Sequence, residues 1–168
     1  LMTFGRTLLS WYQKNKRDLP WRNTRDPYFI WLSEIIMQQT RVEQGLNYYL
    51  CFTEKYPDVF SLARANQDDV MKLWQGLGYY SRARNLHSTA KSIVENYNGK
   101  FPREYSEILK LKGIGEYTAA AISSFAFDEK QAVVDGNVFR FLSRYFGIRT
   151  PIDSSKAKQE FRGVAYDL

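Results

Sequence analysis

Cysteine and histidine are nearly absent from this sequence of 168 residues, which has one of each, Cys51 and His87. A single cysteine excludes an intrachain disulfide framework, and it excludes zinc or iron–sulfur sites built from several thiolates of this chain. The low cysteine content also indicates a reducing compartment. We expect Cys51 to be buried as a small hydrophobic residue and His87 to lie on a helix surface, and we predict no metal site in this chain.

Long apolar runs and strand patterns are also lacking. No segment approaches the roughly 20 apolar residues that a membrane helix requires, and residues 15–26 are too charged for a secretory signal. The apolar run Ala132–Val134 is too short to build a sheet. We therefore predict an all-α protein that does not contact a membrane.

Basic residues are in excess, with 24 Lys and Arg against 18 Asp and Glu, which gives a net charge of +6. A basic surface attracts polyanions, and the aromatic content of 16% could supply groups that stack on bases or wedge between them. An ordinary basic surplus explains the same composition, so charge alone leaves nucleic-acid binding open.

Apolar residues recur at helical spacing through most of the chain, which predicts eight to ten short helices. We expect an apolar stripe at residues 4–12, a polar segment with two prolines that interrupts the pattern at 14–27, a helix capped by Asn66, and a helix stop at Asn98-Gly99. Residues 161–168 still carry the helical pattern, so we expect the chain to be a fragment of a longer protein. The predicted helices cover residues 28–37, 42–56, 66–74, 82–97, 104–111, 116–127, 137–146 and 154 onward.

Two glycines flank one aliphatic residue where a helix ends and another begins, in Gly113-Ile114-Gly115. Glycines allow a tight turn and a close approach to a phosphate, and the new helix presents free N–H groups to the anion. A plain helix–turn–helix corner fits the same residues equally well, so both interpretations stay open here.

Two acidic residues stand next to apolar segments. Glu34 lies within an apolar helix, and such surroundings raise a carboxyl pKa towards neutrality, as a general acid requires. Alternatively, Glu34 faces solvent or pairs with Arg41. Asp135 precedes a helix, where a carboxylate is most simply a cap. It is of interest as a second semi-buried acid, because two carboxylates are the usual equipment for cleaving a glycosidic bond.

The glycine-flanked turn at residues 76–82 displays Leu77 and Tyr79 ahead of Arg82. Such a turn could push a side chain into a base stack while arginines hold phosphates, or it could be an aromatic corner packed in the core. Trp21-Arg22 could likewise form a wall for a flat ligand or a packed loop.

Taken in this order, the motifs resemble the catalytic domain of the MutY-type adenine-specific mismatch glycosylases, which belong to the helix–hairpin–helix DNA repair glycosylases. The resemblance extends from about Leu8 to Phe146. It depends on Leu19-Pro20-Trp21-Arg22, Ser33-Glu34 with Gln38-Gln39-Thr40, Gly76-Leu77-Gly78-Tyr79-Tyr80-Ser81-Arg82, Gly113-Ile114-Gly115 and Val134-Asp135-Gly136-Asn137-Val138.

The resemblance implies a helix–hairpin–helix glycosylase fold, with a six-helix barrel-like lobe at 19–135 and the hairpin motif at about 104–127. Residues 1–18 and 136–168 would form part of an incomplete second lobe. The implied activity is base excision repair by a monomer in the bacterial cytoplasm. The enzyme would bind double-stranded DNA, flip out adenine mispaired with 8-oxoguanine or guanine, and remove it by hydrolysis.

Catalytic roles follow from the same resemblance. Glu34 would protonate the adenine ring and later help to activate water, while Asp135 would stay ionised and stabilise the sugar cation. Asn137 would orient Asp135. Tyr117 stands where relatives of the endonuclease III type carry a lysine that cuts the strand, so the resemblance implies no efficient strand cleavage. Some thymine-mismatch glycosylases also have tyrosine there, so a thymine glycosylase is an alternative.

The resemblance implies DNA contacts as well. Gln39 and Tyr79 would enter the duplex, with Thr40 and Leu77 beside the opposite base. Other residues would line the pocket of the flipped base or hold a phosphate, and these are Trp21, Arg22, Gly113 and Gly115.

Full-length relatives also carry a [4Fe–4S] cluster, whose ligands this chain lacks, and a monovalent cation is possible at the hairpin. A second alternative, from a different class, is a helix–hairpin–helix module that binds DNA without catalysis.

Overall fold

The computed structural model describes residues 2–168, without the side chains of residues 2, 3 and 155, and all regular structure in this range is helical. The predicted all-α class is therefore confirmed. The helices, in chain order, are α1 (Met2–Asn15), η1 (Pro20–Arg22), α2 (Pro27–Met37), α3 (Val42–Lys55), α4 (Val59–Arg64), α5 (Gln67–Leu73), α6 (Ser81–Tyr97), α7 (Tyr105–Ile108), α8 (Glu116–Phe127), α9 (Gly136–Phe146) and α10 (Ser155–Tyr166).

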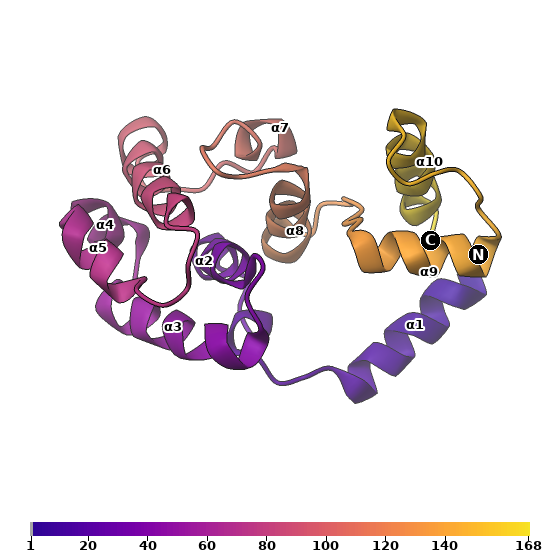
Figure 1. Cartoon of the computed structure of the whole chain (residues 1–168), viewed down its shortest axis with the longest axis horizontal. Coiled ribbons are helices and arrows are strands. Elements are labelled where there is room, and N and C mark those ends of the chain that lie inside the picture. The colour runs from indigo at the N-terminus through magenta and orange to yellow at the C-terminus, as the bar shows by residue number, and fades with distance from the viewer. Residues whose placement is uncertain (1) are drawn as a thin grey trace.

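Helix α2 lies in the middle of the larger group of helices and contacts α3, α6 and α8 (Figure 1). It is apolar on nearly every face, which is typical of a helix buried on all sides. Asp26 caps it by accepting a hydrogen bond from the Tyr28 N–H, and Pro27 occupies the first turn. This burial carries Glu34, the one ionisable side chain within α2 besides Tyr28, into the interior of the protein.

Helix α4 and the short helix η1 were not expected from the sequence. Helix α4 begins with a capping box in which Asp58 accepts from the Ser61 N–H and the Ser61 hydroxyl accepts from the Asp58 N–H. The usual Glu or Gln at the third position is replaced by serine, so the box is hard to recognise. The predicted cap at Asn66 and the left-handed stop at Asn98 are confirmed.

The buried residues form two hydrophobic clusters. The larger cluster contains residues from every helix from α2 through α8. The smaller cluster is centred on Leu142, Ala157 and Phe161 of α9 and α10. Helix α1 runs between the two groups of helices, and the two ends of the chain lie close together beside α9 (Figure 1). Phe4 of α1 packs against the Tyr145 ring, with the ring centres 4.9 Å apart.

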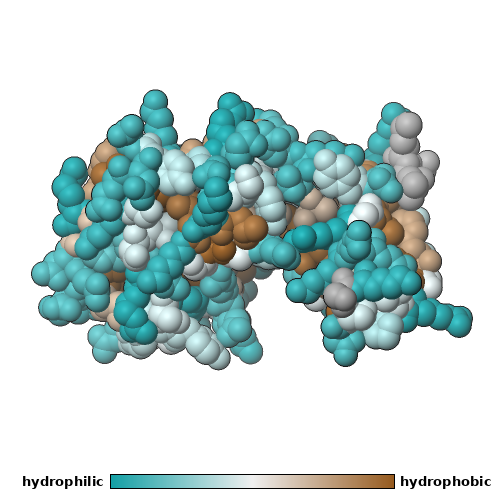
Figure 2. Space-filling model, turned by 90° about the horizontal axis from the view of Figure 1, so that it is seen from above, coloured by the Kyte–Doolittle hydropathy of each residue, from teal (hydrophilic) through white to brown (hydrophobic). Residues whose placement is uncertain are grey.

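The face in Figure 2 is largely hydrophilic, and hydrophobic residues gather near its middle, where the two groups of helices approach each other. No helix in residues 2–168 combines the length and the apolar character that crossing a bilayer requires.

Two sequence-based expectations about burial were wrong. Cys51 is exposed, because Tyr49 and Phe52 occupy the inner face of α3. His87 is buried, because α6 places it on the same inner face as Leu86 and Ala90. The apolar stripe expected in α1 is largely exposed, and Leu9 and Trp11 are 62% and 59% exposed.

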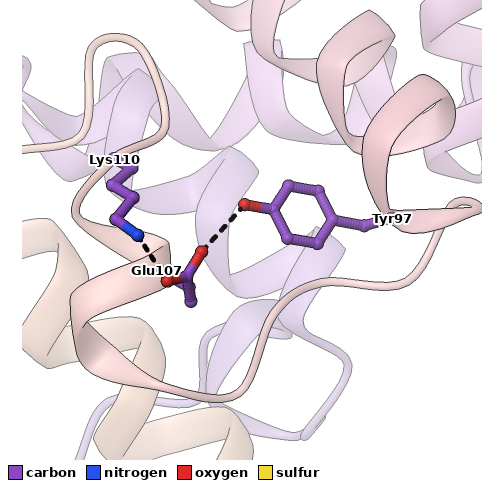
Figure 3. A network of polar contacts seen from close by, with 3 residues as sticks. All are labelled: Tyr97, Glu107 and Lys110. Atoms are coloured by element: carbon purple, nitrogen blue, oxygen red, sulfur yellow. Dashed lines mark hydrogen bonds and ion pairs between the residues drawn. The ribbon is translucent and has the colours of Figure 1, made fainter.

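Side chains hold α7 and the following hairpin against α6. Glu107 of α7 accepts hydrogen bonds from the Tyr97 hydroxyl at 3.3 Å and from Lys110 at 2.5 Å (Figure 3). About two turns before the end of α6, the buried Thr89 donates to the Lys112 carbonyl at 2.7 Å. These contacts fix the chain just before the turn that starts α8.

Candidate active site

Glu34 sits on α2 between the buried residues Ser33 and Ile35 and reaches a cavity wall. Burial raises the pKa of its carboxyl from 4.5 to about 7. The alternative ion pair with Arg41 is not formed among the described residues. Glu34 is therefore half protonated near neutral pH, which suits a group that must donate a proton and then accept one.

Asp135 is the N-cap of α9. Its carboxylate accepts hydrogen bonds from the backbone N–H groups of Asn137 at 2.9 Å and Val138 at 2.8 Å, and from the Asn137 side chain at 3.4 Å. Three donors and the helix N-terminus can hold a negative charge here. The cap expected from the sequence is present, and the carboxylate is still half-buried beside the cavity.

The two acids meet although 101 positions separate them in the sequence. They line one cavity of about 410 Å³ together with Gln39 and Tyr117. Tyr117 lies close enough to sense both charges, because its pKa is raised to about 12 by burial and then by Glu34 and Asp135. Its phenol therefore keeps its proton at neutral pH and lines the same cavity as the two carboxyl groups.

A second cavity, of about 560 Å³, opens on the other side of Glu34 and Tyr117, which line both spaces. Trp21 and Arg22 line it, as expected for a pocket around a flat ligand. The Trp21 ring packs edge-on against Tyr49 at 5.0 Å, so this wall is braced by the core.

Sequence reasoning missed part of this second cavity. An ion pair between Arg25, which precedes α2, and Asp128, which ends α8, closes one side of the rim. Nothing in the sequence connects these two residues. Asp128 adopts a left-handed backbone conformation, with φ of 57°, at the end of α8, and the sequence does not predict this conformation. Phe125 and Tyr12 also line this cavity.

Gln39 and Tyr79 share an unusual backbone conformation, with φ of 54° and 45°. Both side chains are exposed, Tyr79 to 68%, so both are available to a ligand. Thr40 is half-buried beside Gln39. Leu77 differs from the expectation, because it is only 8% exposed and packs in the main core, where little of it can meet a base.

The glycine turn before α8 requires glycine at one of its two positions. Gly113 has φ of 78°, and a Cβ there would lie 2.8 Å from the Cβ of Asn85. Gly115 is the N-cap of α8, with open space around it and no side-chain cap in place. The turn therefore leaves the first N–H groups of α8 available to an anion.

Comparison with known proteins identifies the family of the chain. Residues 32–165 match the family described as HhH-GPD superfamily base excision DNA repair protein. The chain belongs to this family. The HhH-GPD chain is 44% identical over 148 residues to the adenine DNA glycosylase of Buchnera aphidicola and 42% identical over 174 residues to that of Homo sapiens.

These alignments cover 88% and 98% of the chain but 42% and 32% of the two relatives, so the chain spans less than half of their length. Among solved structures, a thermostable thymine-DNA glycosylase is similar with a TM-score of 0.89 and 32% identity, over 99% of this chain and 76% of that one. The resemblance given by the sequence motifs is thereby confirmed at the level of the family and its fold.

The HhH-GPD chain does not fit an iron–sulfur cluster by itself. A [4Fe–4S] cluster requires four ligands, usually thiolates, and the sequence contains one cysteine. No group of three or more His, Cys, Asp or Glu residues that could hold a metal occurs in the described part of the chain.

Proposed function

We propose that this HhH-GPD chain is the catalytic part of a DNA glycosylase that removes adenine mispaired with 8-oxoguanine or guanine. One observation carries the proposal: Glu34 and Asp135 line a single cavity in different surroundings, the first dry and the second rich in N–H donors. Such a difference between two carboxyl groups assigns one as the acid and the other as the charged partner.

Glu34 donates its proton to a ring nitrogen of the flipped adenine, which turns the base into a neutral leaving group as the N-glycosidic bond breaks. Asp135 stays ionised and stabilises the positive charge that develops on the sugar, and Asn137 orients it through its side-chain N–H. Glu34, now a carboxylate, accepts a proton from the attacking water. The products are free adenine and an abasic site.

Tyr117 determines whether the DNA strand is cut after the base is released. A phenol cannot form the imine through which a lysine cuts the strand, so the enzyme releases the base without efficient strand cleavage. The protonated phenol instead places a neutral hydrogen-bond donor in the cavity that the two acids line.

The DNA must present the adenine outside the duplex, at a cost of a few kcal/mol that a mismatch reduces. The cavity beside Trp21 and Arg22 receives the base, while Gln39 and Tyr79 enter the gap that it leaves, with Thr40 nearby. The buried Leu77 supports the turn from below more than it touches the opposite base.

Further proposals concern the hairpin and the state of the protein. The amides of Gly113 and Gly115 bind a phosphate, with a monovalent cation on neighbouring carbonyls. Residues 19–135 form one lobe, and 1–18 with 136–168 form part of a second. The protein acts as a monomer on double-stranded DNA in the bacterial cytoplasm, and a [4Fe–4S] cluster belongs to the longer protein.

A thymine glycosylase is the second candidate, because the solved thymine-DNA glycosylase has so similar a fold. The test measures base release from matched duplexes that contain A:8-oxoguanine, A:G or T:G pairs, with wild-type protein and with Glu34→Gln. We expect release of adenine alone, lost in the variant while duplex binding is kept. Release of thymine favours the second candidate, and release of neither base in the wild type favours a non-catalytic binding module.

A further inference from the structure

Arg82, in the first turn of α6, connects two segments of the chain that are far apart in sequence. Its guanidinium Nη1 lies 3.1 Å from the carbonyl oxygens of Ile35 and Ile36 and 2.5 Å from that of Gln38. Its Nη2 lies 3.0 Å from the Leu77 carbonyl and 3.3 Å from that of Gly78. One side chain thus binds the end of α2 and the turn before α6.

Some of the carbonyls that Arg82 contacts lack a hydrogen-bond donor within their own helix. The last carbonyls of a helix have no partner within the helix, and Ile35 and Ile36 belong to the last turn of α2. A cation is also favoured at a helix C-terminus. The guanidinium is well suited to this task, because its planar fork aims several N–H groups in two directions at once, which an ammonium group cannot do.

The two exposed residues with positive φ stand directly after the contacted carbonyls. The Gln38 carbonyl belongs to the peptide bond that leads into Gln39, and the Gly78 carbonyl belongs to the one that leads into Tyr79. The Arg82 guanidinium also lies 5.9 Å from the centre of the Tyr79 ring, and 5.0 Å from that of the buried Trp74. Arg82 therefore touches the backbone just before each of the two residues.

We propose that Arg82 is a positioning residue that fixes Gln39 and Tyr79 relative to each other, so that both enter the DNA as one rigid unit. The inference rests on the proposed function for what the two residues do, and on the geometry for how they are held. It also changes the interpretation of Arg82 as a phosphate ligand, because both terminal nitrogens are already engaged by carbonyls of the protein.

The test replaces Arg82 by lysine and by glutamine, with Arg64→Lys as the matched control, because Arg64 is an exposed arginine in the last turn of α4. The first readout is amide hydrogen exchange in the free protein, which does not depend on any activity. We expect exchange of the Thr40 and Leu77 amides, which donate to the Met37 and Trp74 carbonyls in the two loops, to accelerate by about tenfold in Arg82→Lys. Amides in the first half of α2 should keep their wild-type rates, and Arg64→Lys should change neither set.

The second readout is DNA binding and single-turnover base release. We expect Arg82→Lys to lower the rate of adenine release by about tenfold or more, because a lysine cannot span both segments. Its affinity for an undamaged duplex, and the salt dependence of that affinity, should stay unchanged in both Arg82 variants. A phosphate ligand predicts the opposite pattern: a shallower salt slope in Arg82→Gln that lysine restores.

Unchanged exchange at the two loops overturns the proposal, and so does wild-type release by Arg82→Lys or restoration of the salt slope by lysine. Equal acceleration at the loops and within α2 also overturns it, because the residue would then serve general stability. If the wild-type protein releases no adenine, the proposed function fails, while the exchange measurement still decides whether Arg82 holds the two loops.

Discussion

Replacement of Glu34 by glutamine should stabilise the protein at alkaline pH while it abolishes base release. Folding raises the pKa of Glu34 from 4.5 to about 7 through burial. Each pKa unit corresponds to about 1.4 kcal/mol, so an ionised Glu34 costs the native state about 3 kcal/mol above pH 7. Glutamine is nearly the same size and has no charge to desolvate.

The sign of the pH dependence follows from which state holds the proton. Below pH 4.5 the carboxyl is protonated in both states and costs nothing. Between pH 4.5 and 7 the unfolded chain releases the proton while the native state keeps it, so stability falls as the pH rises. Above pH 7 both states are ionised and the full penalty is present.

Urea unfolding of wild type and Glu34→Gln at pH 5 and pH 8 measures this effect. We expect the variant to be more stable by about 1 kcal/mol at pH 5 and by about 3 kcal/mol at pH 8. The buried His87 titrates equally in both proteins, so its contribution cancels in the difference. Glu95→Gln, a change at an exposed position of α6, is the control and should stay within about 0.5 kcal/mol at both values. If the difference in unfolding free energy between wild type and Glu34→Gln does not grow with pH, Glu34 is solvated, and burial does not raise its pKa.

Three further outcomes are expected. Asn137→Ala should lower the rate of adenine release by about tenfold with little effect on DNA affinity, measured by single-turnover kinetics, because only the orientation of Asp135 is lost; a proportional loss of affinity would contradict this role. Borohydride should trap no covalent complex between wild-type protein and a substrate duplex, because Tyr117 has no amine; trapping at the level of a lysine enzyme would contradict the proposal. Gly113→Ala should destabilise the protein by about 1–3 kcal/mol and weaken duplex binding, because its φ is 78° and its Cβ would contact Asn85, whereas Gly115→Ala should be tolerated in urea unfolding; equal effects of the two changes would argue against the hairpin geometry.

Strong local patterns made much of the fold predictable from the sequence. Continuous apolar character identified α2, and the apolar spacing of α3, α6 and α9 gave bounds within one or two residues. Helix α4 was missed because its capping box uses Ser61 in place of an acid or amide. The burial of His87 is hard to predict because histidine is common on helix surfaces, and its position on the inner face shows only through its buried neighbours Leu86 and Ala90.

The candidate site was predictable only in part. Neither Glu34 nor Asp135 carries a signal in its own surroundings that points to the other, and their meeting in one cavity depends on the packing of α2, α8 and the segment before α9. Only the resemblance of the ordered sequence motifs to a known glycosylase family connects Glu34 with Asp135. The ion pair of Arg25 with Asp128 and the contacts of Arg82 involve backbone atoms or single exposed charges, which leave no pattern in the sequence.

The pH dependence of single-turnover adenine release from an A:8-oxoguanine duplex tests most directly whether a protonated Glu34 acts opposite a charged Asp135. We expect a rate that falls tenfold per pH unit as the pH rises above about 7, and no measurable release by Glu34→Gln or Asp135→Asn. A rate that rises through pH 7, or substantial release by either variant, would contradict it.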